Sequence, residues 1–154
     1  MTRIYATALA PLLLLLLLTA CAGGRPVTAT HYGPAGLFGG YGERIVEPGV
    51  WRVNARSNGV AQAGFGRNMA MHRAAELVKA AGFSHMQILD QRGRATMMNQ
   101  RQIGESMELL VRGANDPAPP ADCRARQPEH CFTAPVDTVL ASLRPLLHID
   151  QPAQ

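Results

Sequence analysis

The chain has 154 residues, of which 47% are apolar and 17% are charged, and its formal net charge is +4. This length allows one globular domain and excludes a large multidomain enzyme. An apolar fraction near one half excludes a fully disordered chain, while 15 Gly and 11 Pro predict long irregular stretches.

The N-terminus has the features of an export signal. Arg3 precedes an apolar run from Ile4 to Leu18, which is shorter than the roughly twenty residues that a membrane span needs and matches the core of a signal peptide. The run ends in Leu18-Thr19-Ala20-Cys21, which resembles the lipobox of bacterial lipoproteins. This resemblance implies cleavage before Cys21 and lipid attachment to its thiol. The alternative is an ordinary cleaved signal in which Cys21 is incidental.

Two or three acyl chains at one end are enough for stable membrane anchoring. Ala22 follows the cysteine where inner-membrane lipoproteins of enterobacteria carry Asp, and the resemblance to that sorting rule implies the outer membrane. We therefore expect a lipid-anchored protein on the periplasmic face of the outer membrane. Its expected partners are the membrane, through the acyl chains on Cys21, and an envelope protein, peptidoglycan or lipopolysaccharide. The compartment excludes nucleic acid.

The remaining cysteines, Cys123 and Cys131, lie in a segment rich in Pro and Ala. In an oxidising periplasm a local pair of this kind predicts a disulfide. A metal site that includes His130 is the alternative, although the spacing matches no compact zinc signature. Free thiols are the third.

The mature chain divides into three parts by composition. Residues 21–42 are low in charge and rich in Gly, which predicts a lipidated flexible tether. Its aromatic residues Tyr32, Phe38 and Tyr41 either fold back onto the domain or stack on sugar rings of the cell wall. Residues 43–149 form the expected single domain, and residues 150–154 form a frayed tail.

The first predicted elements are a strand and a helix. Residues 50–56 alternate so that Trp51, Val53 and Ala55 point inward, and Asn58-Gly59 provides a turn after them. A helix over residues 64–81 follows, with Gly82 as its C-terminal cap. Its apolar face is formed by Ala70, Met71, Ala74, Leu77, Val78 and Ala81, and its exposed face by His72, Arg73, Glu76 and Lys79.

Two further strands are predicted at residues 85–90 and 106–113, and the polar segment Gln91 to Glu105 between them reads as a long hairpin or mobile loop. Residues 114–130 contain four prolines and predict irregular structure. A last helix runs from about Val136 to Leu147, with Thr133 as the expected N-cap and Pro145 as a kink or end.

The predicted order is therefore strand, helix, strand, strand, helix. This order favours an α+β fold with a small, mainly antiparallel three-stranded sheet and two helices packed on one face.

Several short motifs resemble an uncharacterised family of small proteobacterial outer-membrane lipoproteins. They are Gly40-Tyr41-Gly42-Glu43, Trp51-Arg52-Val53, Asn58-Gly59, Arg73-Ala74-Ala75-Glu76 and Gly82-Phe83. The resemblance covers residues 36 to 90 and does not include the cysteine segment. It implies the envelope location and an α+β fold, and it implies no activity.

Candidate chemistry concentrates on one helix. His72, Arg73 and Glu76 are three or four residues apart and can meet on one face. A His–carboxylate pair can serve as a general base, so a small hydrolase that uses His72 and Glu76 is an alternative to simple surface pairing.

Three other patterns are weaker. Gly64-Phe65-Gly66-Arg67 opens the same helix and could present amides to an anion, but it lacks the rest of a phosphate-binding loop. Seven methionines raise the question of copper, but their spacing favours core packing. With His130 and the cysteines they leave a metal- or ligand-binding lipoprotein as a further alternative.

Positive charge is carried mainly by arginine, which suits carboxylates and phosphates. Arg92, Arg94 and Arg101 lie on expected outward strand positions or in nearby loops. The candidate surface for an anion or partner is Arg52, Arg56, Arg73 and Arg112, and the alternative is a solvated basic face. With no catalytic residue, metal or cofactor assigned, we expect a non-enzymatic binding or structural module.

Overall fold

The structure, a computed structural model, describes residues 29–149. The expected signal peptide, the lipidation site Cys21 and the expected tail at 150–154 lie outside these residues. No helix among the described residues is long and apolar enough to cross a membrane.

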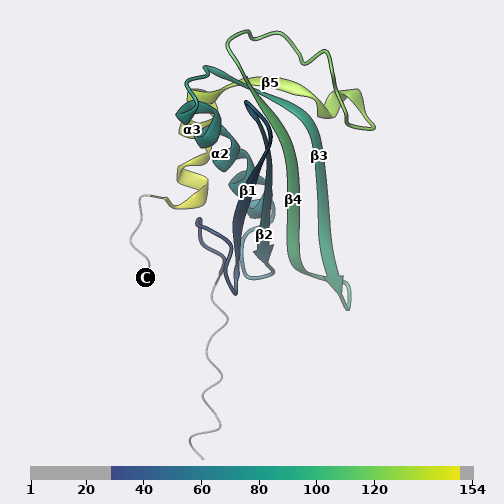
Figure 1. The fold of residues 1–154 in the computed structure, drawn as a ribbon. Coiled ribbons are helices and arrows are strands. Elements are labelled where there is room, and N and C mark those ends of the chain that lie inside the picture. The colour runs from purple at the N-terminus through teal and green to yellow at the C-terminus, as the bar shows by residue number, and fades with distance from the viewer. Residues whose placement is uncertain (1–28, 150–154) are drawn as a thin grey trace, which may run out of the picture.

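The described chain forms one antiparallel sheet of five strands, with both α-helices on one of its faces (Figure 1). The strand order across the sheet is β1-β2-β4-β3-β5. The elements along the chain are β1 (Gly39–Glu47), β2 (Val50–Asn58), α2 (Phe65–Ala80), β3 (His85–Met98), β4 (Arg101–Ala114), the 3-10 helix η2 (Pro128–His130), β5 (Phe132–Pro135), α3 (Val136–Leu143) and the 3-10 helix η3 (Pro145–Leu147).

The predicted three-stranded sheet is therefore wrong, although the fold is α+β, antiparallel and mostly sheet. The two missed strands, β1 and β5, form the edges of the sheet. Most residues of β1 are exposed. β5 has four residues, which are too few to show the two-residue alternation of a strand. Neither edge strand therefore shows the alternation of apolar and polar residues that a half-buried strand requires.

Of the two alternatives predicted for the segment Gln91 to Glu105, a long hairpin or a mobile loop, the structure shows the hairpin. It continues β3 and β4 to a turn at Asn99 and Gln100, both of which have positive φ, as in two-residue hairpin turns. The strands are polar there because this end of the hairpin is exposed on both faces.

The core lies between the sheet and α2. Trp51, Val53 and Ala55 point inward as predicted, and Trp51 forms one row across the sheet with Val111 and Ile88. The alanines of α2 that face the sheet are fully buried, which allows the helix to approach closely. α3 packs on another side of α2, so α2 is covered on more than one side. This explains why His72, predicted to be exposed, is only 4% exposed.

The two ends of α2 are stabilised differently. At its C-terminus Gly82 has a positive φ and donates its amide hydrogen to Lys79, and Phe83 donates to Val78, which is the predicted glycine cap in its Schellman form. At its N-terminus no side chain of the flanking residue caps the helix. The carboxylate of Glu105 from β4 accepts hydrogen bonds from the amides of Gly64 and Arg67 instead.

The outer face of the sheet, opposite the helices, is covered over only part of its area. Val50, Leu89 and Leu110 form a small buried cluster on this face. Leu89 lies at a β-bulge, and its carbonyl accepts a hydrogen bond from the amide of Arg124. The segment at residues 115–131 is largely irregular, as its prolines predict, and this hydrogen bond attaches it to one half of the outer face.

The N-terminal segment of the described chain is part of the fold. Residues 39–42, assigned to the tether, belong to β1, and Tyr32 and Tyr41 pack against the core. At Gly40 a Cβ atom would lie 2.4 Å from the carbonyl oxygen of Pro34, so only glycine fits this close approach. The folded part therefore begins before the expected boundary at residue 43.

The last helix begins and ends close to the predicted positions. Pro135 precedes α3, and Pro145 follows its end and begins η3. Thr133 is not the N-cap, because it lies in β5 and donates its hydroxyl hydrogen to the carbonyl of Ala118.

Candidate functional site

The predicted cluster on α2 forms, and residues of the N-terminal segment complete it. The hydroxyl of Tyr32 donates a hydrogen bond to Glu76 over 2.7 Å. Arg73 donates to Glu76 over 2.9 Å and to Glu43 of β1 over 2.7 Å. The Arg73 guanidinium also lies 4.9 Å from the ring centre of Tyr41. This cluster, hereafter the clamp, joins the N-terminal segment and β1 to α2.

His72 is the buried member of the clamp. Its Nδ1 lies 3.1 Å from the Tyr32 hydroxyl and 3.6 Å from Glu76, so only the tyrosine is at hydrogen-bonding distance. The Tyr32 proton is given to Glu76, so Nδ1 must carry a proton and donate it to the tyrosine oxygen. The unprotonated nitrogen of the neutral ring is then Nε2.

The electrostatics of the clamp fit this assignment. Burial lowers the pKa of His72, Glu76 acts in the opposite direction and Arg144 lowers it further, so the imidazole is neutral at pH 7. Burial and the hydrogen bond to Glu76 raise the pKa of Tyr32 far above its usual range. The hydrogen bond to Glu43 is the first cause of a raised pKa of Arg73, with Glu76 adding to it.

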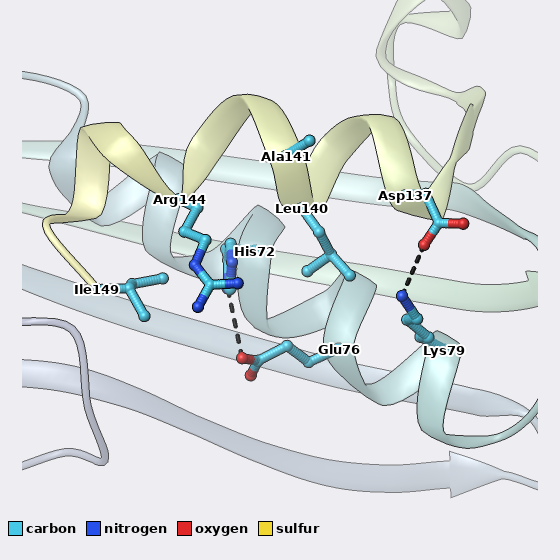
Figure 2. A pocket seen from close by; sticks show the side chains of 8 residues that line it. All are labelled: His72, Glu76, Lys79, Asp137, Leu140, Ala141, Arg144 and Ile149. Carbon is cyan, nitrogen blue, oxygen red and sulfur yellow. Dashed lines mark hydrogen bonds and ion pairs between the residues drawn. The ribbon is translucent and has the colours of Figure 1, made fainter.

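A groove of about 380 Å³ adjoins the clamp between α2 and α3 (Figure 2). Lys79 and Asp137 form an ion pair of 2.7 Å at one end, and Arg144 lies above His72. The residues that line it are His72, Glu76, Lys79, Asp137, Leu140, Ala141, Arg144 and Ile149. This lining includes a potential base in Nε2 of His72, but no Ser, Thr or Cys that could act as a nucleophile.

Three of the four predicted surface arginines are paired within the chain. Arg52 contacts Glu108 at 3.2 Å. Arg112 makes a two-pronged pair with Asp122, which lies in the segment at residues 115–131, hereafter the covering loop. Arg73 belongs to the clamp, on the helix side of the sheet. These three therefore stabilise the fold, and they do not form one continuous anion surface.

The fourth arginine, Arg56, lies in a different environment on the uncovered half of the outer face. It stands opposite Ser106, which on its other side stands opposite Arg94. Arg44 lies on the same face, because it is paired in register with Arg52. All three side chains are exposed, and among residues 29–149 none of them has an ion-pair partner. Arg44, Arg56 and Arg94 are hereafter the outer arginines.

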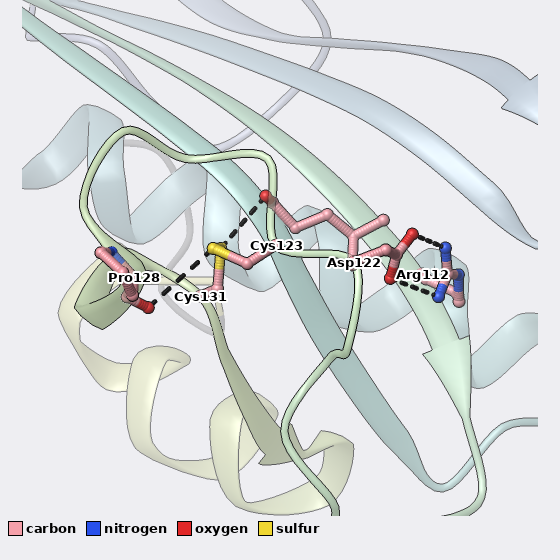
Figure 3. The surroundings of a disulfide bond; sticks show 6 residues. Arg112, Asp122, Cys123, Pro128 and Cys131 are labelled. Carbon is pink, nitrogen blue, oxygen red and sulfur yellow. Dashed lines mark hydrogen bonds and ion pairs between the residues drawn. A yellow bond between two sulfur atoms is a disulfide. The ribbon is translucent and has the colours of Figure 1, made fainter.

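The cysteines form the predicted disulfide, Cys123–Cys131, in the loop that covers the outer face (Figure 3). The Arg112–Asp122 pair lies next to it, and Arg112 lowers the pKa of Asp122 through their hydrogen bonds. Both thiols are used in this bond, which removes the metal alternative at His130. The described part of the chain contains no group of three or more His, Cys, Asp or Glu that could hold a metal ion.

The two remaining candidate sites also have other roles. The anion expected at the Gly64 end of α2 is the carboxylate of Glu105, so this helix end is already occupied by the chain itself. Met86 and Met107 are buried in the core as expected, and on α2 Met69 is fully buried whereas Met71, predicted on the apolar face, is only partly buried. Met97 and Met98, predicted to be adjacent in a loop, lie instead at the end of β3 and are each 58% exposed.

Comparison of the chain with family models, with curated proteins and with solved structures gives no match.

Proposed function

We propose that this protein is a lipid-anchored, non-enzymatic envelope lipoprotein on the periplasmic face of the outer membrane. We further propose that it binds an anionic partner through the outer arginines. Peptidoglycan is the favoured partner, because its peptide carboxylates lie in the periplasm and arginine binds carboxylates in a two-pronged geometry.

The observation that carries the proposal is the contrast in arginine pairing. Among residues 29–149, carboxylates pair with Arg52, Arg73 and Arg112, and none pairs with the outer arginines. Two of these, Arg56 and Arg94, lie on the strands on either side of Ser106 of β4 and so present their charges on the same face of the sheet. Exposed cations gathered in this way favour binding of a negatively charged polymer.

The clamp supports the non-enzymatic part of the proposal. Glu76 already accepts hydrogen bonds from Tyr32 and Arg73, and His72 is buried behind them. These groups are used to fasten the N-terminal segment, which leads toward the lipid anchor, to the domain. The pair that could have served as catalytic base therefore has a sufficient structural role.

Anchoring is tested by fractionation. The native chain is expected in the outer-membrane fraction after washing at high salt, and the Cys21→Ala variant is expected to be soluble in the periplasm. If Cys21→Ala stays on the outer membrane after the wash, the anchoring proposal is wrong.

Partner binding is tested by co-sedimentation with purified peptidoglycan sacculi. The Arg56→Ala/Arg94→Ala variant is expected to lose most of the sedimented protein, and added salt should weaken binding by the native chain. The matched control is Arg67→Ala/Arg126→Ala, which removes the same charge from exposed arginines elsewhere and should bind as the native chain does. Equal binding by both variants, or binding only to lipopolysaccharide, would reject peptidoglycan as the partner of this surface.

The alternative of a hydrolase rests on His72, which lines the groove and whose Nε2 is the base in the tautomer assigned above. The His72→Asn variant separates the two functions, because its amide keeps a donor near the position of Nδ1 and removes the base. We expect this variant to retain membrane location and sacculus binding. Loss of a wall-directed cleavage activity in a folded His72→Asn variant would favour the hydrolase.

A further inference from the structure

Most of the large apolar side chains that are exposed among residues 29–149 gather at one end of the sheet. They are Leu37, Phe38, Val60, Met97, Met98 and Ile103, hereafter the apolar end, with exposed fractions from 41% to 99%. Single exposed apolar residues are normal on a protein surface, whereas a group of this kind marks a contact surface.

Three separate segments bring these residues together. The hydroxyl of Thr30 donates to the carbonyl of Phe38 and accepts a hydrogen bond from the amide of Asn58. Asn58 stands opposite Gly104 of β4, and Gly59 lies against the backbone of Ile103. The loop before β1, the turn after β2 and the β3–β4 hairpin therefore share one end of the molecule (Figure 1).

The hairpin projects beyond the other strands at this end. β2 ends at Asn58, which is paired in register with Gly104 of β4. The turn at Asn99 and Gln100 lies about four residues beyond Gly104. At the rise of an antiparallel strand this is roughly 13 Å. Met97, Met98 and Ile103 lie on the projecting part.

The chain enters the described domain at the same end. Ala29 is the first described residue, and its neighbour Thr30 is hydrogen-bonded to Asn58. Only seven residues lie between Cys21 and Ala29, so eight Cα–Cα steps join them. A chain of this length cannot span more than roughly 28 Å. A lipid on Cys21 would therefore hold this end at a distance from the membrane that the projecting hairpin can bridge.

The charge of the hairpin suits a phospholipid surface. Residues 92–104 contain three arginines and no Asp or Glu. Arg101 is exposed next to the turn. Arginines can keep their guanidinium groups at the level of lipid phosphates while neighbouring apolar side chains enter the layer below.

We propose that the apolar end rests on the lipid surface to which the protein is anchored, with Met97, Met98 and Ile103 entering its interfacial layer. This inference rests on the proposed lipid anchor. It gives the domain a fixed orientation, in which the β3–β4 hairpin touches the membrane and the turn between β1 and β2 points away from it.

The test uses the full lipidated chain in vesicles of phosphatidylethanolamine and phosphatidylglycerol, with and without brominated acyl chains. One variant, Met98→Trp, reports from the apolar end, and the matched control, Ile45→Trp, reports from an exposed apolar position on β1 near the far end of the sheet. The unsubstituted chain gives the contribution of buried Trp51. We expect added emission from Met98→Trp that is shifted to shorter wavelength and lost with brominated lipid, and added emission from Ile45→Trp that is unaffected by bromine.

Flotation of each variant with the vesicles separates this inference from the anchor. If the lipidated chain floats but the added emission of Met98→Trp is as insensitive to bromine as that of Ile45→Trp, the anchor stands and the membrane contact is wrong. Equal quenching of both variants would overturn the proposed orientation. Failure to float would overturn the anchor, and the contact inferred from it would fall as well.

Discussion

The two halves of the outer sheet face differ in how far they are covered and in how their charged residues are paired. Over Val50, Leu89 and Leu110 the face is covered by a long irregular loop, which a disulfide closes and the Arg112–Asp122 pair fastens. The other half carries Arg56 and Arg94 without carboxylate partners and continues into an apolar hairpin tip. Burial, pairing and cross-linking thus serve stability on one half. The other half leaves charges and apolar groups exposed that would serve a partner better than they serve the fold.

Removing the disulfide is the most direct way to disturb the covered half. The Cys123→Ser/Cys131→Ser variant should lower the free energy of unfolding by about 2.5 kcal/mol, the entropy of closing a loop of about nine residues in the unfolded chain. Chemical denaturation of the oxidised native chain and of the variant measures this difference. Arg56 and Arg94 lie outside the loop that the disulfide closes, so sacculus binding by the folded variant should be unchanged.

The clamp extends the comparison to the helix side of the sheet, where Arg73 is paired with two carboxylates, those of Glu43 and Glu76. Arg73→Met should lower the free energy of unfolding by about 2 kcal/mol, because Glu43 and Glu76 lose their charged hydrogen-bond donor while the apolar stem is retained. The same denaturation experiment measures the loss. An unchanged midpoint would show that the clamp does not fasten the N-terminal segment.

The Arg112–Asp122 pair on the covered half should have a smaller effect that depends on pH. Asp122→Asn should cost no more than about 1 kcal/mol at pH 7, since both side chains are partly exposed. Hydrogen bonds from Arg112 lower the pKa of Asp122 in the folded state. The contribution is therefore complete above the carboxyl pKa of the unfolded chain and is lost as the pH falls through the folded pKa. The stabilities of native and variant proteins should converge in acid, and a constant difference down to low pH would contradict the pairing.

The outer arginines should matter least to stability. Arg56→Ala/Arg94→Ala should change the free energy of unfolding by less than about 0.5 kcal/mol, as expected for exposed residues without partners. Thermal unfolding of this variant beside Arg67→Ala/Arg126→Ala checks the prediction. A large loss of stability would show that these side chains support the fold, and the contrast between the two halves would disappear.

Local signals in the sequence predicted local structure well. The alternation around Trp51 predicted β2, Gly82 predicted the end of α2, and the spacing of Cys123 and Cys131 predicted their bond. Pro145 likewise ended the last helix. Each of these features depends on a few neighbouring residues and on general stereochemistry.

The features that the sequence did not predict depend on residues far apart in the chain. Tyr32 meets Glu76 across 44 positions, and Glu105 caps a helix that begins 40 positions earlier, at Phe65. No periodic pattern contains such pairs. The burial of His72 follows from the packing of α3 and the N-terminal segment against α2, which an amphipathic-helix argument for α2 alone cannot include.

The central claim, an anchored domain whose loop is closed by a disulfide, is tested most directly by native, non-reduced mass spectrometry of the protein extracted from its own membranes. We predict the mass of the chain from Cys21 with attached acyl groups, less the two hydrogens of one disulfide, and with no further adduct. A chain that begins elsewhere or carries no lipid would contradict the anchor. Free thiols at Cys123 and Cys131, or a retained metal, would contradict the role of the covering loop.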